Sequence, residues 1–258
     1  MSPINIAVLV KEVPDPEGTF SFDVDGRAQT AHLPRVPSLF DENAVEAAVQ
    51  IKEQCGGRIV ALCCGPAEAE RTVRYAMAMG ADDGVLIEDT ERAWDSLGAA
   101  CLLAAAVRRL GGFDLILCGR EAADTGSGLV GPYVAQMLSI PFLTLVTSIE
   151  TGDGAFHVRR LWEGGEDVFA CIPPVLLTVC AETNTPRYPT VLKVLGAKKR
   201  PLQRWNAHEL AAAVPVPPAR LLGRYPSAAP GNCDFISGDS AEALAQGLFS
   251  RLRERKVV

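Results

Sequence analysis

The sequence predicts an α/β protein whose mostly parallel sheet has helices on both faces, antiparallel additions and an extended C-terminal arm. From the N-terminus to about residue 146, apolar runs of strand length alternate with segments of helical periodicity, which is typical of a parallel sheet. Beyond that point, glycine-containing turns separate extended stretches, as in an antiparallel meander. The 258 residues are enough for one large core or two small ones.

The first half of the chain predicts four strands joined by helices. Residues 4–10 form an apolar run, the pattern of a strand buried on both faces. Residues 14–37 contain prolines and an Asp-Gly turn signal, and are expected to form a long loop or a small hairpin. Apolar residues spaced by four, three and four predict a helix from Asp41 to Cys55. Further strands are expected at residues 58–63, 84–87 and 115–118, with helices along residues 73–80 and 96–110.

The second half predicts a short helix, a meander and an arm. The helix carries Val130, Val134 and Leu138 on one face. The meander is expected to begin at residues 142–146, to turn at residues 151–154 and 163–165, and to end with a strand at residues 175–179. After about residue 181 the alternation stops and prolines accumulate. We therefore expect an α/β domain over residues 1–184 and a C-terminal arm over residues 185–258.

The arm is expected to finish in a helix. Asp239 can cap its start with Glu242 three positions on, and Leu244, Leu248 and Leu252 form one apolar stripe. The stripe could pack on the sheet of its own chain, but the proline-rich segment before it favours contact with a partner chain.

Composition excludes several classes of protein. With 25 basic and 31 acidic residues the net charge is −6, so no nucleic-acid-binding face is expected. No apolar run reaches the roughly 18 residues of a membrane span, so no membrane insertion is expected, and the N-terminus does not resemble a signal peptide. The eight cysteines contain no Cys-x-x-Cys pair and are interpreted as core residues in a reducing cytoplasm. The three histidines share no ligand spacing, and no metal site is expected.

The loop after the fourth strand is the candidate binding site. Residues 118–132 contain four glycines and the hydroxyls of Thr125 and Ser127, and they lead into a helix. Free amides at a helix start favour an anion such as phosphate, although a tight connection without a ligand is the alternative. The loop matches neither the dinucleotide fingerprint nor the Walker pattern. No nucleophile and base are placed together and no catalytic residue is predicted, which favours a carrier or a regulator over a hydrolase.

A second candidate is the strip at residues 184–200, in which apolar residues lie beside five cations. This composition is suited to docking on an acidic partner, whereas the alternative is a solvated basic tail.

Several motifs resemble the β subunit of electron-transfer flavoproteins. They are Val8 to Asp15, Cys64-Gly65-Pro66-Ala67, Ala78 to Asp82, the loop at Asp124, and above all Pro186-Arg187-Tyr188-Pro189-Thr190 followed by Ala197-Lys198-Lys199. The resemblance spans nearly the whole chain. It implies a Rossmann-like, adenine-nucleotide-binding domain over residues 1–184.

The resemblance also implies partners and cofactors. Members of the family form a heterodimer with an α subunit, whose FAD carries electrons between dehydrogenases, such as acyl-CoA dehydrogenase, and a quinone oxidoreductase or ferredoxin. The β subunit itself holds AMP or, in the bifurcating branch, which oxidises NADH, a second FAD. In the bifurcating branch the loop usually reads Asp-Gly-Asp-Thr-Ala-Gln-Val-Gly-Pro, whereas this loop lacks the second carboxylate and the amide side chain. AMP and FAD therefore both stay open.

Carried over to this sequence, the resemblance implies that Leu9 and Val10 contact the adenine and that Ser38 and Asp41 lie at its edge and ribose. Cys64 would border the site at the end of the second strand. The phosphate loop would comprise Asp124, Thr125, Gly126, Ser127, Gly128, Val130 and Gly131. The partner-docking residues are expected to be Arg187, Tyr188, Val191, Leu192, Leu195, Lys198 and Lys199. Val191 stands where the family usually presents an anchoring leucine. The alternative function is an adenine-nucleotide-binding regulator of the universal-stress type, which shares the sheet but generally lacks such an arm.

Overall fold

The computed structural model describes residues 3–25, 27–88, 95–210 and 233–258. The chain divides into two compact units. The larger comprises Met1–Ser21 and Gln29–Leu222, and the smaller comprises Phe22–Ala28 and Gly223–Val258.

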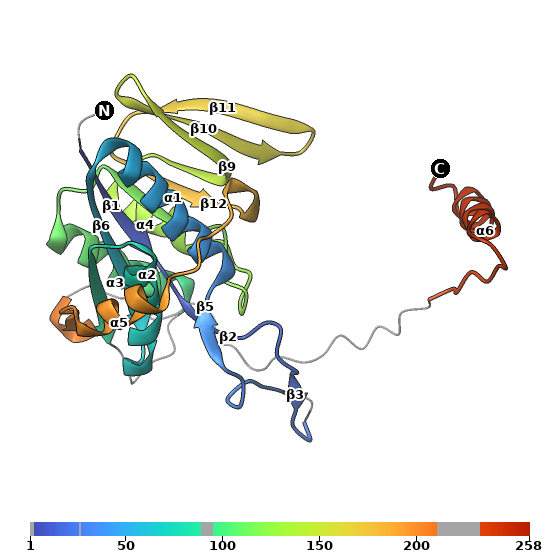
Figure 1. The fold of residues 1–258 in the computed structure, drawn as a ribbon, viewed down its shortest axis with the longest axis horizontal. Helices are drawn as coiled ribbons and strands as arrows, with labels where there is room; N and C mark the ends of the chain where they lie inside the picture. Colours follow the sequence, from blue (N-terminus) through green and yellow to red (C-terminus); the bar gives the residue numbers. More distant parts are fainter. Residues whose placement is uncertain (1–2, 26, 89–94, 211–232) are drawn as a thin grey trace. The chain divides into compact units, whose positions relative to one another are not determined.

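Within the described residues, the larger unit is built on a nine-stranded sheet with the order β11-β10-β9-β12-β8-β1-β6-β7-β13 (Figure 1). Neighbouring strands are parallel all along the run β9-β12-β8-β1-β6-β7-β13. Strand β10, in contrast, runs antiparallel to both of its neighbours, β9 and β11. The mostly parallel α/β fold with antiparallel additions is therefore confirmed. The strands are β1 (Ile4–Leu9), β6 (Gly57–Gly65), β7 (Asp83–Glu88), β8 (Leu115–Gly119), β9 (Phe142–Gly152), β10 (Ala155–Trp162), β11 (Gly165–Cys171), β12 (Val175–Val179) and β13 (Gln203–Asn206).

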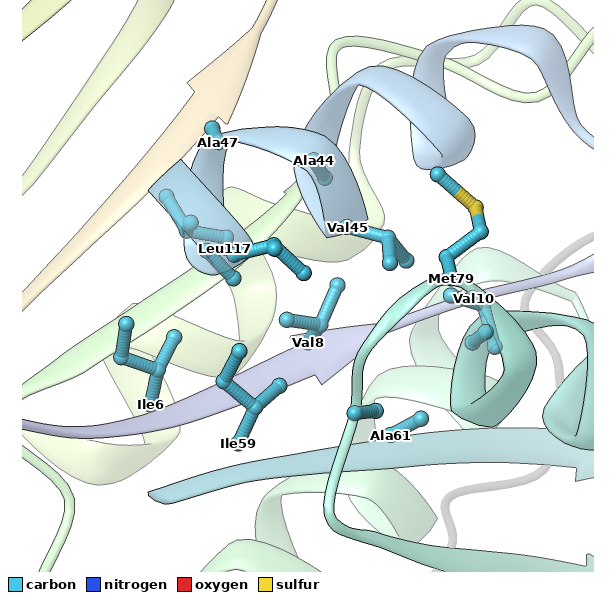
Figure 2. Close-up of a cluster of buried hydrophobic side chains, with 14 of the residues drawn as sticks. Ile6, Val8, Val10, Ala44, Val45, Ala47, Ile59, Ala61, Met79 and Leu117 are labelled. Atoms are coloured by element: carbon cyan, nitrogen blue, oxygen red, sulfur yellow. The ribbon is translucent and has the colours of Figure 1, made fainter. Parts of the chain in front are cut away.

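Helices cover both faces of this sheet. Helices α1 (Leu39–Cys55) and α2 (Glu70–Met79) share one hydrophobic cluster with the sheet, and α3 (Ser96–Leu110) and α4 (Val130–Leu138) share another. Strand β1 supplies both clusters, because Ile6 and Val8 face α1 whereas Ala7 and Leu9 face the opposite side. Figure 2 shows Ile6 and Val8 below α1. The prediction that β1 is buried on both faces is confirmed.

The order of the strands creates a switch point between β1 and β8. The chain moves from β1 to β6 and β7 on one side, and then returns to place β8 on the other side of β1. The carboxyl ends of β1 and β8 are neighbours, since Leu9 pairs with Cys118. Ligands of open parallel sheets bind at such a crevice.

The meander differs from the prediction in its last strand. β12 does not continue the antiparallel run but lies between β9 and β8, parallel to both. All five of its residues are buried. A central position, with a neighbouring strand on each side, buries these residues, whereas a position at the edge of the sheet would leave them partly exposed. β9 is also longer than expected, and a bulge interrupts its pairing near Leu145, where φ is +59°.

The segment between β1 and α1 contains paired strands rather than an open loop. Strand β2 (Glu12–Pro14) pairs with β5 (Arg35–Pro37), and β3 (Ser21–Phe22) pairs with β4 (Ala28–Gln29). The small-hairpin alternative for residues 14–37 is therefore the correct one.

Residues 185–210 differ from the predicted arm because they are partly helical and belong to the larger unit. Helix α5 (Val191–Lys199) packs on α2, where Arg74 Nη1 donates to the carbonyl of Ala197 at 2.6 Å. Strand β13 extends the sheet beside β7. The rest of the predicted arm up to residue 232 lies outside the described residues.

The terminal helix of the smaller unit is α6 (Ala241–Glu254), as predicted in type. Its N-cap is Ser240, whose hydroxyl accepts from the amide of Ala243 at 3.1 Å, so the prediction of Asp239 as the cap is wrong by one residue. Leu244 and Leu248 are exposed within this unit. Three short 3-10 helices complete the described elements: Ala67–Ala69, Ala181–Thr183 and Ala207–Leu210.

None of the eight cysteines forms a disulfide within the described residues; Cys63, Cys118 and Cys180 are buried and Cys233 is exposed. In the described part of the chain, no helix combines the length and apolar character that crossing a membrane requires.

Candidate functional site

The candidate site lies at the switch point, where β1 and β8 end and α1 begins. A single carboxyl group joins these three elements. Asp41, in the first turn of α1, is buried, and its two oxygens accept from the amides of Lys11 at 2.8 Å and Gly119 at 2.9 Å. Burial raises the pKa of Asp41 to about 7, while the two backbone hydrogen bonds oppose the rise. A Cβ at Gly119 would lie 2.7 Å from Asp41 Oδ1, so glycine is required for this close approach.

Ser38 precedes α1 at the N-cap position. A serine there normally accepts a hydrogen bond from an amide of the first turn, but this side chain makes no cap bond. Ser38 is completely buried, and its Oγ has no hydrogen-bond partner among the described residues. Its amide donates to the carbonyl of Lys11 at 2.9 Å, which fixes it beside the end of β1. Because buried hydroxyls are nearly always paired, this oxygen fits a site that is completed by a polar ligand.

The glycine loop after β8 is shaped by backbone hydrogen bonds. The amide of Gly126 donates to the carbonyl of Ala122 at 2.8 Å, which closes a turn. Gly126 and Gly128 have φ values of +58° and +62°, a conformation that residues with side chains rarely adopt. The Oγ of Ser127 lies 2.9 Å from that of Ser96, so the loop is joined to the start of α3.

The end of this loop presents the first turn of α4. Leu129 occupies the N-cap position and provides no side-chain cap for the amides of Val130 and Gly131. These two amides at the start of α4 are suited to an anion, whereas Pro132 has no amide hydrogen to offer. A Cβ at Gly131 would lie 2.7 Å from Thr178 Cγ2. The absence of a side chain at Gly131 thus lets α4 begin directly against β12.

Sequence reasoning missed one charged residue of the site. Lys11 Nζ lies 2.6 Å and 2.8 Å from the carboxylate oxygens of Asp124, so it joins the end of β1 to the glycine loop. Nothing in the spacing of these residues indicates the contact, since they are 113 positions apart. Once β1 and β8 are known to be neighbours, however, a lysine two residues after the end of β1 becomes an evident candidate.

Other predicted residues lie at the same edge of the sheet. Leu9 and Val10 are buried at the end of β1, and the amide of Val10 already donates to the carbonyl of Leu62 at 2.8 Å. Cys64 lies at the end of β6, partly buried. The structure thus brings the predicted residues to the ends of β1, β6 and β8 and to the starts of α1 and α4.

The predicted docking residues lie on a different element. Tyr188, Val191 and Leu192 are 90%, 76% and 81% exposed, and Leu195 is 50% exposed. Lys198 and Lys199 are exposed in the last turn of α5. Arg187 differs from the rest of the set, because its guanidinium pairs with Glu46 and Glu53 of α1.

No group of three or more potential metal-ligating side chains is found within the described residues. The fold and the site define an α/β protein with a candidate anion site at its switch point and a separate exposed apolar surface.

The comparisons with known proteins identify the family. Residues 29–210 match the family model described as the electron transfer flavoprotein domain. The chain belongs to the electron transfer flavoprotein family and resembles its β subunits throughout.

Three relatives show how far the similarity extends. The electron transfer flavoprotein subunit beta of Bacillus subtilis is 34% identical over 260 residues, which cover 99% of this chain and all of the relative. That of Thermoanaerobacterium thermosaccharolyticum is 32% identical over 265 residues, with the same coverage. The caffeyl-CoA reductase-Etf complex subunit CarD of Acetobacterium woodii is 32% identical over 267 residues, again over 99% of this chain and the whole relative.

Proposed function

We propose that this chain is a non-catalytic electron-carrier subunit that pairs with an FAD-containing α subunit and binds AMP or a second FAD at the switch point. The observation that carries the nucleotide site is the hydroxyl of Ser38, which is buried and has no partner within the described structure. It lies in the segment joining β1 to α1, close to Asp41. Family membership favours this function over a universal-stress-type regulator.

The residues present fit an adenine nucleotide. Ser38 offers a hydroxyl to a ribose or an adenine edge, and the uncapped start of α4 offers amides to a phosphate. Lys11 adds a cation, which Asp124 orients. A bound flavin would supply redox chemistry, while the protein binds, orients and tunes it. Asp41 would act indirectly, by holding the backbone of Lys11 and Gly119 in place.

The exposed surface of α5 is proposed to dock a redox partner. Apolar side chains there lie beside three exposed lysines, Lys193, Lys198 and Lys199, which complement an acidic surface and would steer its approach. Acyl-CoA dehydrogenase and a quinone oxidoreductase are the proposed partner classes, and the cytoplasm is the proposed compartment. The name of the Acetobacterium relative places that protein in a complex with a reductase, which supports an assembly of several subunits here as well.

The nucleotide is tested by co-purifying the chain with its α subunit, extracting the complex with acid and separating the products by chromatography. One FAD and one AMP per heterodimer would support a simple carrier. Two FAD would support the bifurcating reaction, in which NADH is oxidised. Finding one FAD and no second nucleotide would refute the switch-point site, and finding no flavin at all would refute the carrier function.

The variant Ser38→Ala tests where the nucleotide lies. Loss of one hydrogen bond is worth about 1 kcal/mol, so we expect the affinity of the complex for AMP or FAD to fall roughly fivefold. Ser237→Ala removes an exposed hydroxyl from the smaller unit and is the matched control. Equal affinities of the two variants, measured by equilibrium dialysis, would place the nucleotide elsewhere.

A further inference from the structure

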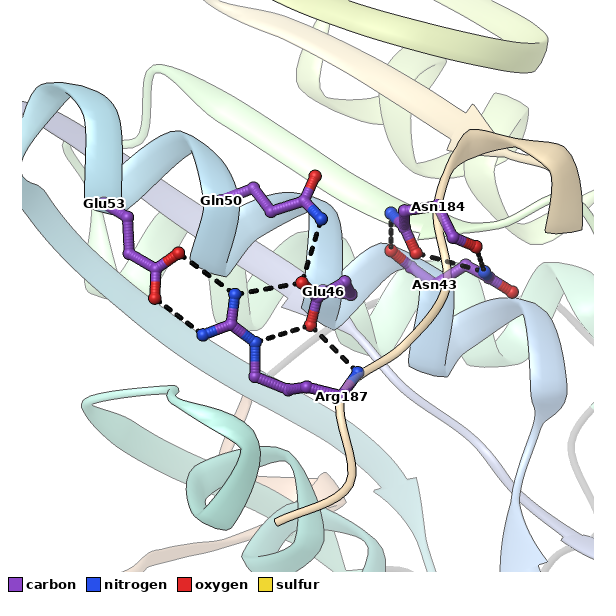
Figure 3. Close-up of polar contacts among 6 residues, drawn as sticks. All are labelled: Asn43, Glu46, Gln50, Glu53, Asn184 and Arg187. Carbon is purple, nitrogen blue, oxygen red and sulfur yellow. Dashed lines mark hydrogen bonds and ion pairs between the residues drawn. The ribbon is translucent and has the colours of Figure 1, made fainter.

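One polar face of α1 holds the segment that leads into α5 (Figure 3). Asn43, Glu46, Gln50 and Glu53 are spaced by three, four and three residues, which places them on the same face of the helix. At the N-terminal end of this face, Asn43 Nδ2 donates to the carbonyl of Asn184 at 2.8 Å, and Asn184 Nδ2 donates to the carbonyl of Asn43 at 3.0 Å. This segment is therefore fixed to α1 before α5 begins.

Arg187 makes the strongest contacts along this face. Its Nε and Nη2 donate to the two oxygens of Glu46 at 2.8 Å and 3.0 Å, and its Nη1 and Nη2 donate to those of Glu53 at 2.6 Å and 3.0 Å. The amide of Arg187 adds a bond of 3.2 Å to Glu46. A planar guanidinium is suited to such two-pronged pairing, which an ammonium group cannot reproduce. Most of the N–H groups of the guanidinium therefore donate to α1, and few are left to bind another molecule.

The charges of this cluster depend on one another. The side chain of Glu46 is only 4% exposed, and its burial alone would raise its pKa, but the hydrogen bonds from Arg187 hold that pKa below its usual value. Gln50 supplies a further bond to Glu46 at 2.9 Å. Hydrogen bonding to Arg187 also lowers the pKa of Glu53, which is exposed at the surface. Arg187 is therefore the cation that allows a carboxylate to be buried beneath this segment.

The residues directly after Arg187 are held by the backbone rather than by packing. Tyr188 is 90% exposed, and Pro189 limits the conformations of the chain before Thr190. The hydroxyl of Thr190 accepts from the amide of Lys193 and caps α5. At the other end of α5, Arg74 donates to the carbonyl of Ala197. Arg187 and Arg74 thus fix the two ends, Ala197 is buried, and Tyr188, Val191 and Leu192 face solvent.

We propose that Arg187 is a positioning residue, which orders Tyr188 and the first turn of α5 so that their apolar side chains are presented to a redox partner in one conformation. This inference rests on the proposed docking function of α5. It assigns Arg187 a different role from Tyr188, Val191 and Leu192, because Arg187 contacts its own chain and the other three are free to contact the partner. An ordered surface binds more tightly, since less conformational entropy is lost on association.

The test uses the assembled heterodimer and the variant Arg187→Met. Hydrogen exchange of the amides in residues 194–199 should accelerate at least tenfold, because the upstream end of α5 is released. In an electron-transfer assay with an acyl-CoA dehydrogenase, KM for that partner should rise about tenfold. The value of kcat and the flavin content should stay as in the unmodified complex, and a merely structural defect would lower both. Arg58→Met, which removes an exposed arginine paired with Asp83, is the matched control.

Milder variants keep the test decisive if Arg187→Met assembles poorly. Glu53→Gln removes the exposed half of the pairing, and Arg187→Lys keeps the charge without the planar geometry. Both variants should accelerate hydrogen exchange and raise KM, as Arg187→Met does, but by smaller factors. Unchanged exchange in the variants, or faster exchange without a change in KM, would overturn the inference. Failure of the unmodified complex to accept electrons from any dehydrogenase would instead refute the proposed docking function, while the exchange data alone would still show whether Arg187 orders the segment.

Discussion

Replacing Asp41 by asparagine removes one ionisable group from the junction of β1, β8 and α1 while keeping nearly the same shape. The two oxygens of this carboxyl group accept from the amides of Lys11 and Gly119, and both keep acceptor capacity when the group is protonated. An asparagine has only one side-chain oxygen, so it can serve only one of those donors. The buried donor left unpaired should cost about 1–3 kcal/mol at every pH. The variant is therefore expected to be less stable than the unmodified chain in mildly acidic solution.

The difference in stability should depend on pH because burial raises the pKa of Asp41 from 3.8 to about 7. The folded chain then keeps a proton that the unfolded chain releases, so the free energy of unfolding falls as the pH rises through this window. The two pKa values give a loss of about 2 kcal/mol between pH 5 and pH 7, with little further change above roughly pH 8. The asparagine variant lacks this loss, so the two stabilities should converge as the pH rises.

Urea unfolding of the full-length chain at pH 5, 6, 7 and 8 measures this convergence. Asp153→Asn, in the exposed turn between β9 and β10, is the matched control for removal of a carboxyl group. The contrary result is a stability difference between the Asp41 variant and the unmodified chain that stays constant over the whole pH range. That result would show that the hydrogen bonds from the two backbone amides lower the pKa of Asp41 at least as much as burial raises it. The reasoning about Asp41 would then be wrong.

Two further substitutions test the packing of the fold. Phe156→Ala empties a fully buried position where the meander packs on the core that contains α1. It should lower the free energy of unfolding, measured by urea titration, by about 3–5 kcal/mol. A loss below about 1 kcal/mol would mean that the meander does not pack as described. Gly196→Ala adds a methyl group in the exposed middle of α5, where its Cβ would meet no described atom within 4 Å outside the adjoining part of the helix. It should raise stability by up to about 1 kcal/mol, seen as a higher Tm. A lower Tm for Gly196→Ala would contradict the helical conformation of this glycine.

The parallel core was predictable because its local patterns agree with its tertiary structure. The helix at residues 96–110 was predicted with the bounds that the structure shows, since a glycine follows its last apolar residue. The strands at the centre of the sheet were recognised because they are apolar on both faces. For such segments the local and the global preferences coincide.

Pairing partners were less predictable than elements. An apolar run such as residues 175–179 does not reveal whether its neighbours will be parallel, so β12 was assigned to the meander. β13 is mostly polar and exposed, and gave no strand signal among the prolines around it. In the site, the pairing of Lys11 with Asp124 and the bridge from Asp41 to Gly119 depend on strand order alone. Neither could be found before the switch point was located.

The central position of β12 constrains the order in which the chain can assemble. Strands β1, β6, β7 and β8 can associate once residue 119 has been synthesised, because each lies next to another member of this group. β9, β10 and β11 must wait, since in the described sheet β9 is joined to the other parallel strands through β12, which follows all three in the sequence. During synthesis the meander therefore lacks its final neighbour and exposes apolar surface such as Phe156 until residues 175–179 emerge. Substitutions that weaken β12 should consequently reduce the yield of folded protein more than its final stability.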